Sequence, residues 1–97
     1  MQELQVNKEN CFSVLMAVYK KEQPLFFKEA LRSVFEQSLI PNEVVLVKDG
    51  PLTEELEQII VDFSSKNEQL KVITLEKNQG LGEALRIGLN ACSFDLV

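Results

Sequence analysis

The sequence predicts an α/β fold in which a parallel sheet is covered by helices on both faces. Short apolar runs rich in β-branched residues alternate with longer segments whose apolar residues recur at helical spacing. The connections between them are short, which favours right-handed crossovers and a doubly wound layer. The 97 residues are enough for one domain and too few for a second.

The first strand is expected at residues 12–18, an apolar run without helical spacing that is typical of a strand buried on both faces. A helix is expected at 24–37, because Pro24 suits its first turn and apolar residues then recur three, four, seven and eight positions apart. Residues 1–11 are polar enough to form a loose leader, and we expect the domain to occupy residues 12–97.

The second strand is expected at residues 44–47 and ends in Lys48-Asp49-Gly50-Pro51. Thr53 is a suitable cap for a second helix that ends near residue 66 or 67. A third strand is expected at 71–75 and a third helix at 81–92, where Gly88 lies in the apolar stripe and indicates close packing. Residues 93–97 have the pattern of the approach to a fourth strand.

Composition excludes several classes of function. The 15 acidic and 10 basic residues give a net charge of -5, which repels nucleic acid backbones. The absence of histidine excludes a Ser-His-Asp triad and a histidine-ligated zinc. Cys11 and Cys92 have neither metal-site nor disulfide spacing, so we interpret them as buried or idle thiols. With no secretion signal and no long apolar run, the chain is expected to be cytoplasmic.

Ligands of such sheets bind beyond the carboxyl ends of the strands, so the residues after each apolar run are the candidates for a site. Asp49 can accept hydrogen bonds from a ribose hydroxyl or from the N–H of a uracil, and it can equally be a turn aspartate. Tyr19 can stack on a base or simply pack at the surface.

Two further candidates lie near the third helix. Gly80 follows Asn78 and Gln79 in a segment suited to a cap and a tight turn. Arg86 lies off the apolar stripe, where it can meet a diphosphate or remain solvated. Gly80 and Gly82 do not make a dinucleotide-binding fingerprint, because they follow the third strand and Leu85 stands where the third glycine belongs.

Four short motifs stand in order along the chain. They are Ala17-Val18-Tyr19-Lys20, Ser33-Val34-Phe35-Glu36-Gln37, Glu43-Val44-Val45-Leu46-Val47-Lys48-Asp49-Gly50-Pro51 and Asn78-Gln79-Gly80-Leu81-Gly82-Glu83-Ala84. The series resembles family-2 glycosyltransferases of the GT-A fold, whose motifs are Pro-Thr-Tyr-Asn, Ser-x-x-x-Gln, Glu-x-x-x-Val-Asp-Asp-Gly-Ser and Asn-x-Gly-x-x-x-Ala. The variants Val-Lys-Asp-Gly-Pro and Glu-Lys-Asn-x-Gly-Leu-Gly are most similar to bacterial exopolysaccharide transferases of the amylovoran type.

The resemblance implies a Rossmann-like three-layer sandwich with strand order three-two-one and the start of a fourth strand beside the first, as in a truncated GT-A domain. It implies that Asp49 contacts the uracil or ribose of a UDP-sugar while Ala17 and Tyr19 line the base pocket. The chain departs from the family where Ala17 and Val18 replace Pro-Thr and where Lys48 replaces the first aspartate of the pair.

The resemblance also implies an inverting transferase that passes a sugar to a saccharide or lipid-linked acceptor in polysaccharide biosynthesis, at the inner face of the membrane in the full-length protein. Family members hold Mn²⁺ or Mg²⁺ with an Asp-x-Asp motif and use a later carboxylate as general base, and neither is in this sequence. We therefore expect this chain to bind nucleotide weakly, to be inactive alone, and to self-associate through an exposed sheet edge.

A non-enzymatic alternative is a receiver-like module in which Asp49 would be phosphorylated, or a silent assembly piece. Receivers have an acidic pair after the first strand, whereas this chain has Tyr19-Lys20-Lys21 there. Titration with UDP-sugars separates these hypotheses, because a receiver should not respond.

Overall fold

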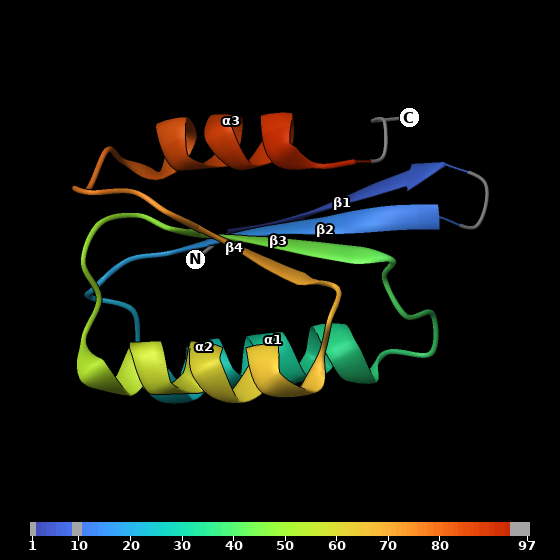
Figure 1. Cartoon of the computed structure of the whole chain (residues 1–97), viewed down its shortest axis with the longest axis horizontal. Coiled ribbons are helices and arrows are strands. Elements are labelled where there is room, and N and C mark those ends of the chain that lie inside the picture. The colour runs from blue at the N-terminus through green and yellow to red at the C-terminus, as the bar shows by residue number, and fades with distance from the viewer. Residues whose placement is uncertain (1, 9–10, 94–97) are drawn as a thin grey trace.

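The computed structural model describes residues 2–8 and 11–93, with side chains from Phe12 onward. One sheet lies between two helices on one face and a single helix on the other (Figure 1). The elements in chain order are β1 (Gln2–Lys8), β2 (Cys11–Val18), α1 (Pro24–Glu36), β3 (Glu43–Lys48), α2 (Glu54–Lys66), β4 (Leu70–Thr74) and α3 (Leu81–Ala91). The predicted α/β class and three-layer arrangement are confirmed.

The sheet has the order β1-β2-β3-β4, and the last three strands run parallel. The three predicted strands correspond to β2, β3 and β4, so the predicted order three-two-one is confirmed. Met16 of β2 is paired in register with Leu46 of β3, which is paired with Val72 of β4. The carboxyl ends of the three strands therefore meet at one edge of the sheet.

The N-terminal segment corrects one prediction. Residues 2–8 are not a loose leader, because they form β1, which pairs antiparallel with β2 from Gln2 opposite Ala17 to Lys8 opposite Cys11. The unpaired backbone groups along the edge of β2 favour this addition, and polar side chains do not oppose it. The predicted placement of residues 94–97 beside the first strand lies outside the described residues.

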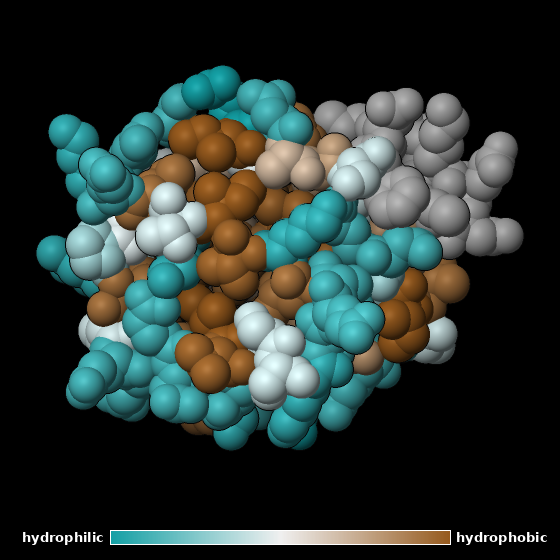
Figure 2. Space-filling model, viewed as in Figure 1, coloured by the Kyte–Doolittle hydropathy of each residue, from teal (hydrophilic) through white to brown (hydrophobic). Residues whose placement is uncertain are grey.

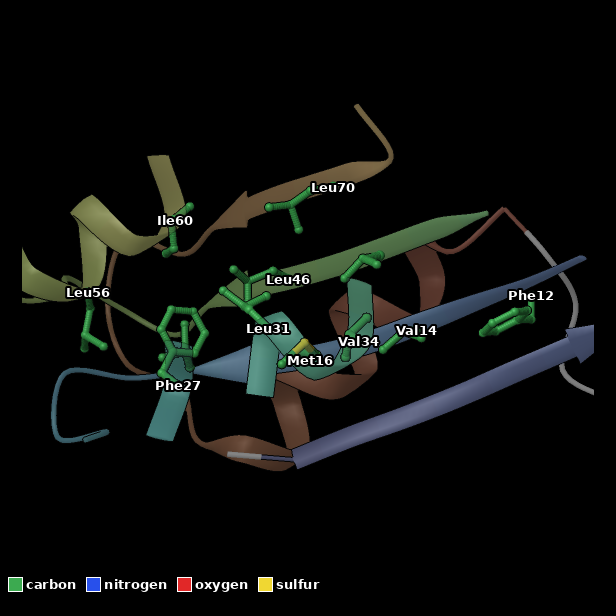
Figure 3. Packing of buried hydrophobic residues seen from close by; sticks show 12 residues of the cluster. Phe12, Val14, Met16, Phe27, Leu31, Val34, Leu46, Leu56, Ile60 and Leu70 are labelled. Carbon is green, nitrogen blue, oxygen red and sulfur yellow. The ribbon is translucent and has the colours of Figure 1, made fainter. Parts of the chain in front are cut away.

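The core is divided by the sheet into two clusters. The larger one packs the buried face of α1, formed by Phe27, Leu31 and Val34, and residues of α2 against one face of the sheet (Figure 3). The smaller cluster lies under α3 and consists of Leu15, Ala17, Val45, Val47 and Ala84. Adjacent strand residues belong to different clusters because side chains alternate between the faces of a strand.

Gly88 lets α3 approach the sheet closely. A Cβ added there would lie 2.3 Å from Cδ1 of Leu15 and 2.7 Å from Cγ2 of Val47. The close packing predicted from this glycine is confirmed. The predicted cap of α2 is also confirmed, since the Thr53 hydroxyl accepts a hydrogen bond from the backbone N–H of Leu56 at 3.3 Å.

The two edges of the sheet differ. β1 covers the edge of β2, where we expected an exposed strand, while β4 pairs with β3 alone among the strands of the described residues. Figure 2 shows apolar side chains in a band between α3 and α2 on the face that carries β4, and Val72 is exposed there. Self-association through a sheet edge stays a prediction. Over the described ranges, no helix combines the length and apolarity needed to cross a membrane.

Candidate functional site

A pocket of about 320 Å³ lies at the carboxyl ends of β2 and β3, beside the N-terminal end of α3. Its volume is at the lower end of the range for small-molecule sites, roughly 300–1,000 Å³. It is lined by Ala17, Val18, Tyr19, Asp49, Asn78, Gly80 and Leu81. Four of the five residues predicted for a nucleotide site are thus brought together, although they come from three separate stretches of the chain.

β2 supplies the apolar wall and the aromatic ring. Ala17 and Val18 are buried, whereas Tyr19, one residue past the strand, is 39% exposed. The carbonyl oxygen of Tyr19 accepts a hydrogen bond from the backbone N–H of Glu22 at 3.0 Å, closing the turn that leads to α1. Tyr19 therefore lies in the pocket lining while remaining partly exposed to solvent.

Asp49 supplies the only charge in the lining. Its backbone N–H donates to the carbonyl of Val18 at 2.8 Å, which extends the pairing of β2 and β3 past the ends of the strands. Asp49 is 5% exposed. Its Oδ1 accepts a hydrogen bond from the backbone N–H of Gln79 at 2.7 Å. The other oxygen, Oδ2, has no hydrogen-bond partner among the described residues. Asp49 thus has a structural role through Oδ1, and its second acceptor oxygen is not used by the described residues.

Gly50 and Asn78 hold the two loops of the site together. Gly50 has φ +90°, and a Cβ there would lie 2.6 Å from the backbone nitrogen of Asn78. The Asn78 side-chain amide donates to the carbonyl of Asp49 at 3.3 Å, and its Oδ1 accepts from the backbone N–H of Gly80 at 3.1 Å. The hydrogen bond between Asn78 and Gly80 forms the tight turn predicted at residues 78–80, but the predicted side-chain cap is absent from α3. The pocket position of Asn78 was missed, because it depends on a contact between residues 29 apart.

The N-terminal end of α3 borders the pocket through Gly80 and Leu81. Gly80 is the N-cap with φ +93°, and no side chain caps the helix. Arg86 does not line the pocket. Its guanidinium pairs with Glu83 through Nε at 3.1 and 3.2 Å, its side chain is 60% exposed, and this hydrogen bond lowers the pKa of Glu83. A contact between Arg86 and a diphosphate stays a prediction.

The lining contains one carboxylate, two neutral polar residues and apolar walls, and it contains no cation. Lys48, which precedes Asp49, instead pairs with Glu57 of α2 at 2.7 Å. An anionic acceptor in an apolar pocket favours groups that donate hydrogen bonds and disfavours phosphate. The pocket therefore suits the base or ribose of a nucleotide better than its diphosphate.

The pocket offers few carboxylates to a metal ion. No group of three or more histidine, cysteine, aspartate or glutamate side chains is placed to hold a metal in the part of the chain that the structure describes. Mn²⁺ and Mg²⁺ prefer several oxygen ligands, and the pocket offers only Asp49. The lining residues alone do not fit such an ion. Cys92 is half-buried, and burial raises the pKa of its thiol, which fits an idle thiol.

The fold and pocket define a class: an α/β domain with a pocket at the carboxyl ends of its parallel strands, where such folds bind ligands. The chain belongs to glycosyl transferase family 2, whose family model matches residues 13–97. The family predicted from the four motifs is confirmed. The receiver-like alternative has no support from this comparison.

Similar curated proteins are bacterial glycosyltransferases. The chain is 50% identical over 86 residues to the UDP-Gal:alpha-D-GlcNAc-diphosphoundecaprenol beta-1,3-galactosyltransferase of Escherichia coli. It is 44% identical to an uncharacterized glycosyltransferase of Haemophilus influenzae and 41% identical to the amylovoran biosynthesis glycosyltransferase AmsE of Erwinia amylovora, each over 86 residues. Each alignment covers 89% of this chain and 31% or 32% of the relative, so the chain spans about a third of their length.

Proposed function

We propose that this chain binds the nucleoside part of a nucleotide-sugar donor, a UDP-sugar, for a transferase of bacterial polysaccharide biosynthesis. The observation that carries the proposal is the unpartnered Oδ2 of Asp49 in a pocket without cations, beside the exposed ring of Tyr19. The E. coli relative carries UDP-Gal in its name, which supports the choice of UDP.

The chemistry of the base supports the same choice. Uracil carries an N–H at position 3, which can donate a hydrogen bond to a carboxylate, whereas cytosine carries an acceptor at that position. A ribose hydroxyl can also donate to Oδ2. Tyr19 would stack on the base at the mouth of the pocket, and Ala17 would let the ring approach the end of β2.

The rest of the reaction is assigned to the full-length protein. We propose an inverting transfer of the sugar to a saccharide or lipid-linked acceptor, and the diphosphoundecaprenol in the name of the E. coli relative supports a lipid-linked one. Mn²⁺ or Mg²⁺ would offset charge on the departing UDP, held by carboxylates other than the lining residues. The 97-residue chain alone is then inactive, and the protein acts in the cytoplasm at the inner face of the membrane.

Calorimetry with UDP tests the nucleoside assignment. Asp49→Asn keeps an oxygen that can accept from Gln79 but replaces the ligand-facing acceptor with an N–H₂ donor, so we expect UDP binding to weaken at least about tenfold. The control is Glu54→Gln, an exposed carboxylate at the start of α2 outside the pocket, which should leave affinity unchanged. CDP should bind the wild-type chain more weakly than UDP.

The assignment is wrong if Asp49→Ala leaves every UDP-induced chemical shift unchanged. The choice of uracil is wrong if CDP and UDP bind equally to the wild type and both respond equally to Asp49→Asn, since Asp49 would then contact the ribose that both nucleotides share.

A further inference from the structure

The N-terminal end of α1 exposes two large apolar side chains. Leu25 is 63% exposed and Phe26 is 67% exposed, the highest values for large apolar residues in the described part of the chain. They follow Pro24 and precede Phe27, which is fully buried against the sheet. The first turn of α1 is therefore anchored through one phenylalanine while the neighbouring two side chains point away from the core.

Lysines flank this apolar pair in the sequence. Lys20, Lys21 and Lys28 are all exposed, and none of them forms an ion pair with another described residue. Of the acidic side chains nearby, Glu29 is engaged by Arg32 at 2.6 Å. Residues 19–33 contain four basic and two acidic residues, although acidic residues outnumber basic ones in the whole chain. The local charge is thus opposite in sign to the net charge.

We propose that Leu25 and Phe26, with Lys20, Lys21 and Lys28, form a docking surface for an anionic phospholipid bilayer. Exposed apolar side chains insert at the boundary between headgroups and acyl chains, and basic side chains are attracted to anionic headgroups. The two features occur together at this end of α1. The other strongly exposed apolar pair, Leu39 and Ile40, has no basic residue between positions 33 and 47.

The docking surface adjoins the candidate pocket, because Tyr19 lines the pocket and Lys20 and Lys21 form the turn that follows it. Docking there would hold the pocket next to the bilayer, where a lipid-linked acceptor presents its sugar. This link to the acceptor rests on the proposed function. Binding to a bilayer does not, since it requires neither UDP nor an acceptor.

Flotation with phospholipid vesicles tests the proposal. Vesicles of phosphatidylcholine with about a third phosphatidylglycerol should bind the chain at least about tenfold more tightly than vesicles of phosphatidylcholine alone. Leu25→Ser/Phe26→Ser and, separately, Lys20→Gln/Lys21→Gln should each weaken binding by about tenfold or more. The matched controls Leu39→Ser/Ile40→Ser and Lys66→Gln/Lys77→Gln should stay within about twofold of wild type. Circular dichroism confirms that each variant is folded.

The proposal is overturned if the wild type does not bind, if it binds neutral vesicles equally well, or if the controls lose as much binding as the test variants. If Leu25→Ser/Phe26→Ser does not fold, the comparison of Lys20→Gln/Lys21→Gln with its control Lys66→Gln/Lys77→Gln tests the proposal. Sedimentation velocity without lipid gives another test that can contradict the proposal. If the wild type is a dimer and Leu25→Ser/Phe26→Ser is a monomer, the surface binds a second copy of the chain and not a bilayer. If the wild-type chain binds vesicles but does not bind UDP, only the proposed function is refuted.

Discussion

The carboxylate of Glu43 accepts a hydrogen bond from the backbone N–H of Ser93 at 2.8 Å, which joins the start of β3 to the chain just past α3. The same carboxylate accepts from the hydroxyl of Ser13 at 2.6 Å and pairs with the ammonium of Lys71. Glu43 is 3% exposed. One buried acid therefore ties β2, β3, β4 and the end of α3 together, at the end of the sheet opposite the pocket.

This network predicts a loss of stability in acid. Burial alone raises the pKa of Glu43, but hydrogen bonds from Lys71, Ser13 and Ser93 outweigh burial and lower the pKa to about 2 from its ordinary value of 4.5. The unfolded chain takes up a proton near pH 4.5 that the folded chain takes up only near pH 2, so the stabilisation is complete above pH 4.5 and is lost as the pH falls toward 2.

Urea unfolding across this pH range measures the effect. Glu43→Gln should lower the free energy of unfolding at pH 7 by roughly 2 kcal/mol, a discounted value because Lys71 is half exposed. The difference from wild type should shrink between pH 4.5 and pH 2. Glu36→Gln, which alters an exposed pair with Arg32, should change stability by less than about 0.5 kcal/mol at every pH. A constant difference between wild type and Glu43→Gln would contradict the linkage.

Gly88 predicts a second effect on stability. Gly88→Ala places a methyl group against Leu15 and Val47, which are both fully buried, so we expect it to destabilise the fold by about 1–3 kcal/mol. Gly82 is the matched control in the same helix, because a Cβ there would meet nothing within 4 Å. Gly82→Ala should stabilise by about 0.5–1 kcal/mol through its helix propensity. Thermal unfolding of both variants should show shifts of opposite sign.

The two glycines with positive φ predict a difference at the pocket. Gly80→Ala is strained only by its backbone, which costs about 1–3 kcal/mol. Gly50→Ala adds a clash with the backbone of Asn78, so it should destabilise more and should also weaken UDP binding by moving the loop that Asp49 holds. Unfolding and UDP titration of both variants check this order. Equal free energies of unfolding for the two variants would contradict this prediction, because the loops around Gly50 and Asn78 would then move apart with no loss of stability.

The sequence predicted the parts of this fold that depend on local periodicity. Apolar spacing located β2, β3, β4 and the three helices, and the rule that ligands bind at the carboxyl ends of strands placed Asp49 and Tyr19 at one pocket. β1 was missed because its residues are mostly polar, with only Leu4 and Val6 apolar, and because its pairing depends on the free edge of β2. The role of Glu43 was missed because Ser93, its partner, lies 50 residues away. Contacts of that range leave no mark in local composition.

The last prediction concerns metal dependence. A divalent cation strengthens nucleotide binding where carboxylates hold it against the diphosphate, but the pocket supplies only Asp49, and Oδ1 of that residue is engaged by Gln79. The chain also carries a net charge of -5, which disfavours the diphosphate. UDP affinity measured by calorimetry should therefore be the same with Mn²⁺ and with EDTA. A tenfold gain with Mn²⁺, worth about 1.4 kcal/mol, would mean that carboxylates of this chain assemble a metal site around the bound nucleotide.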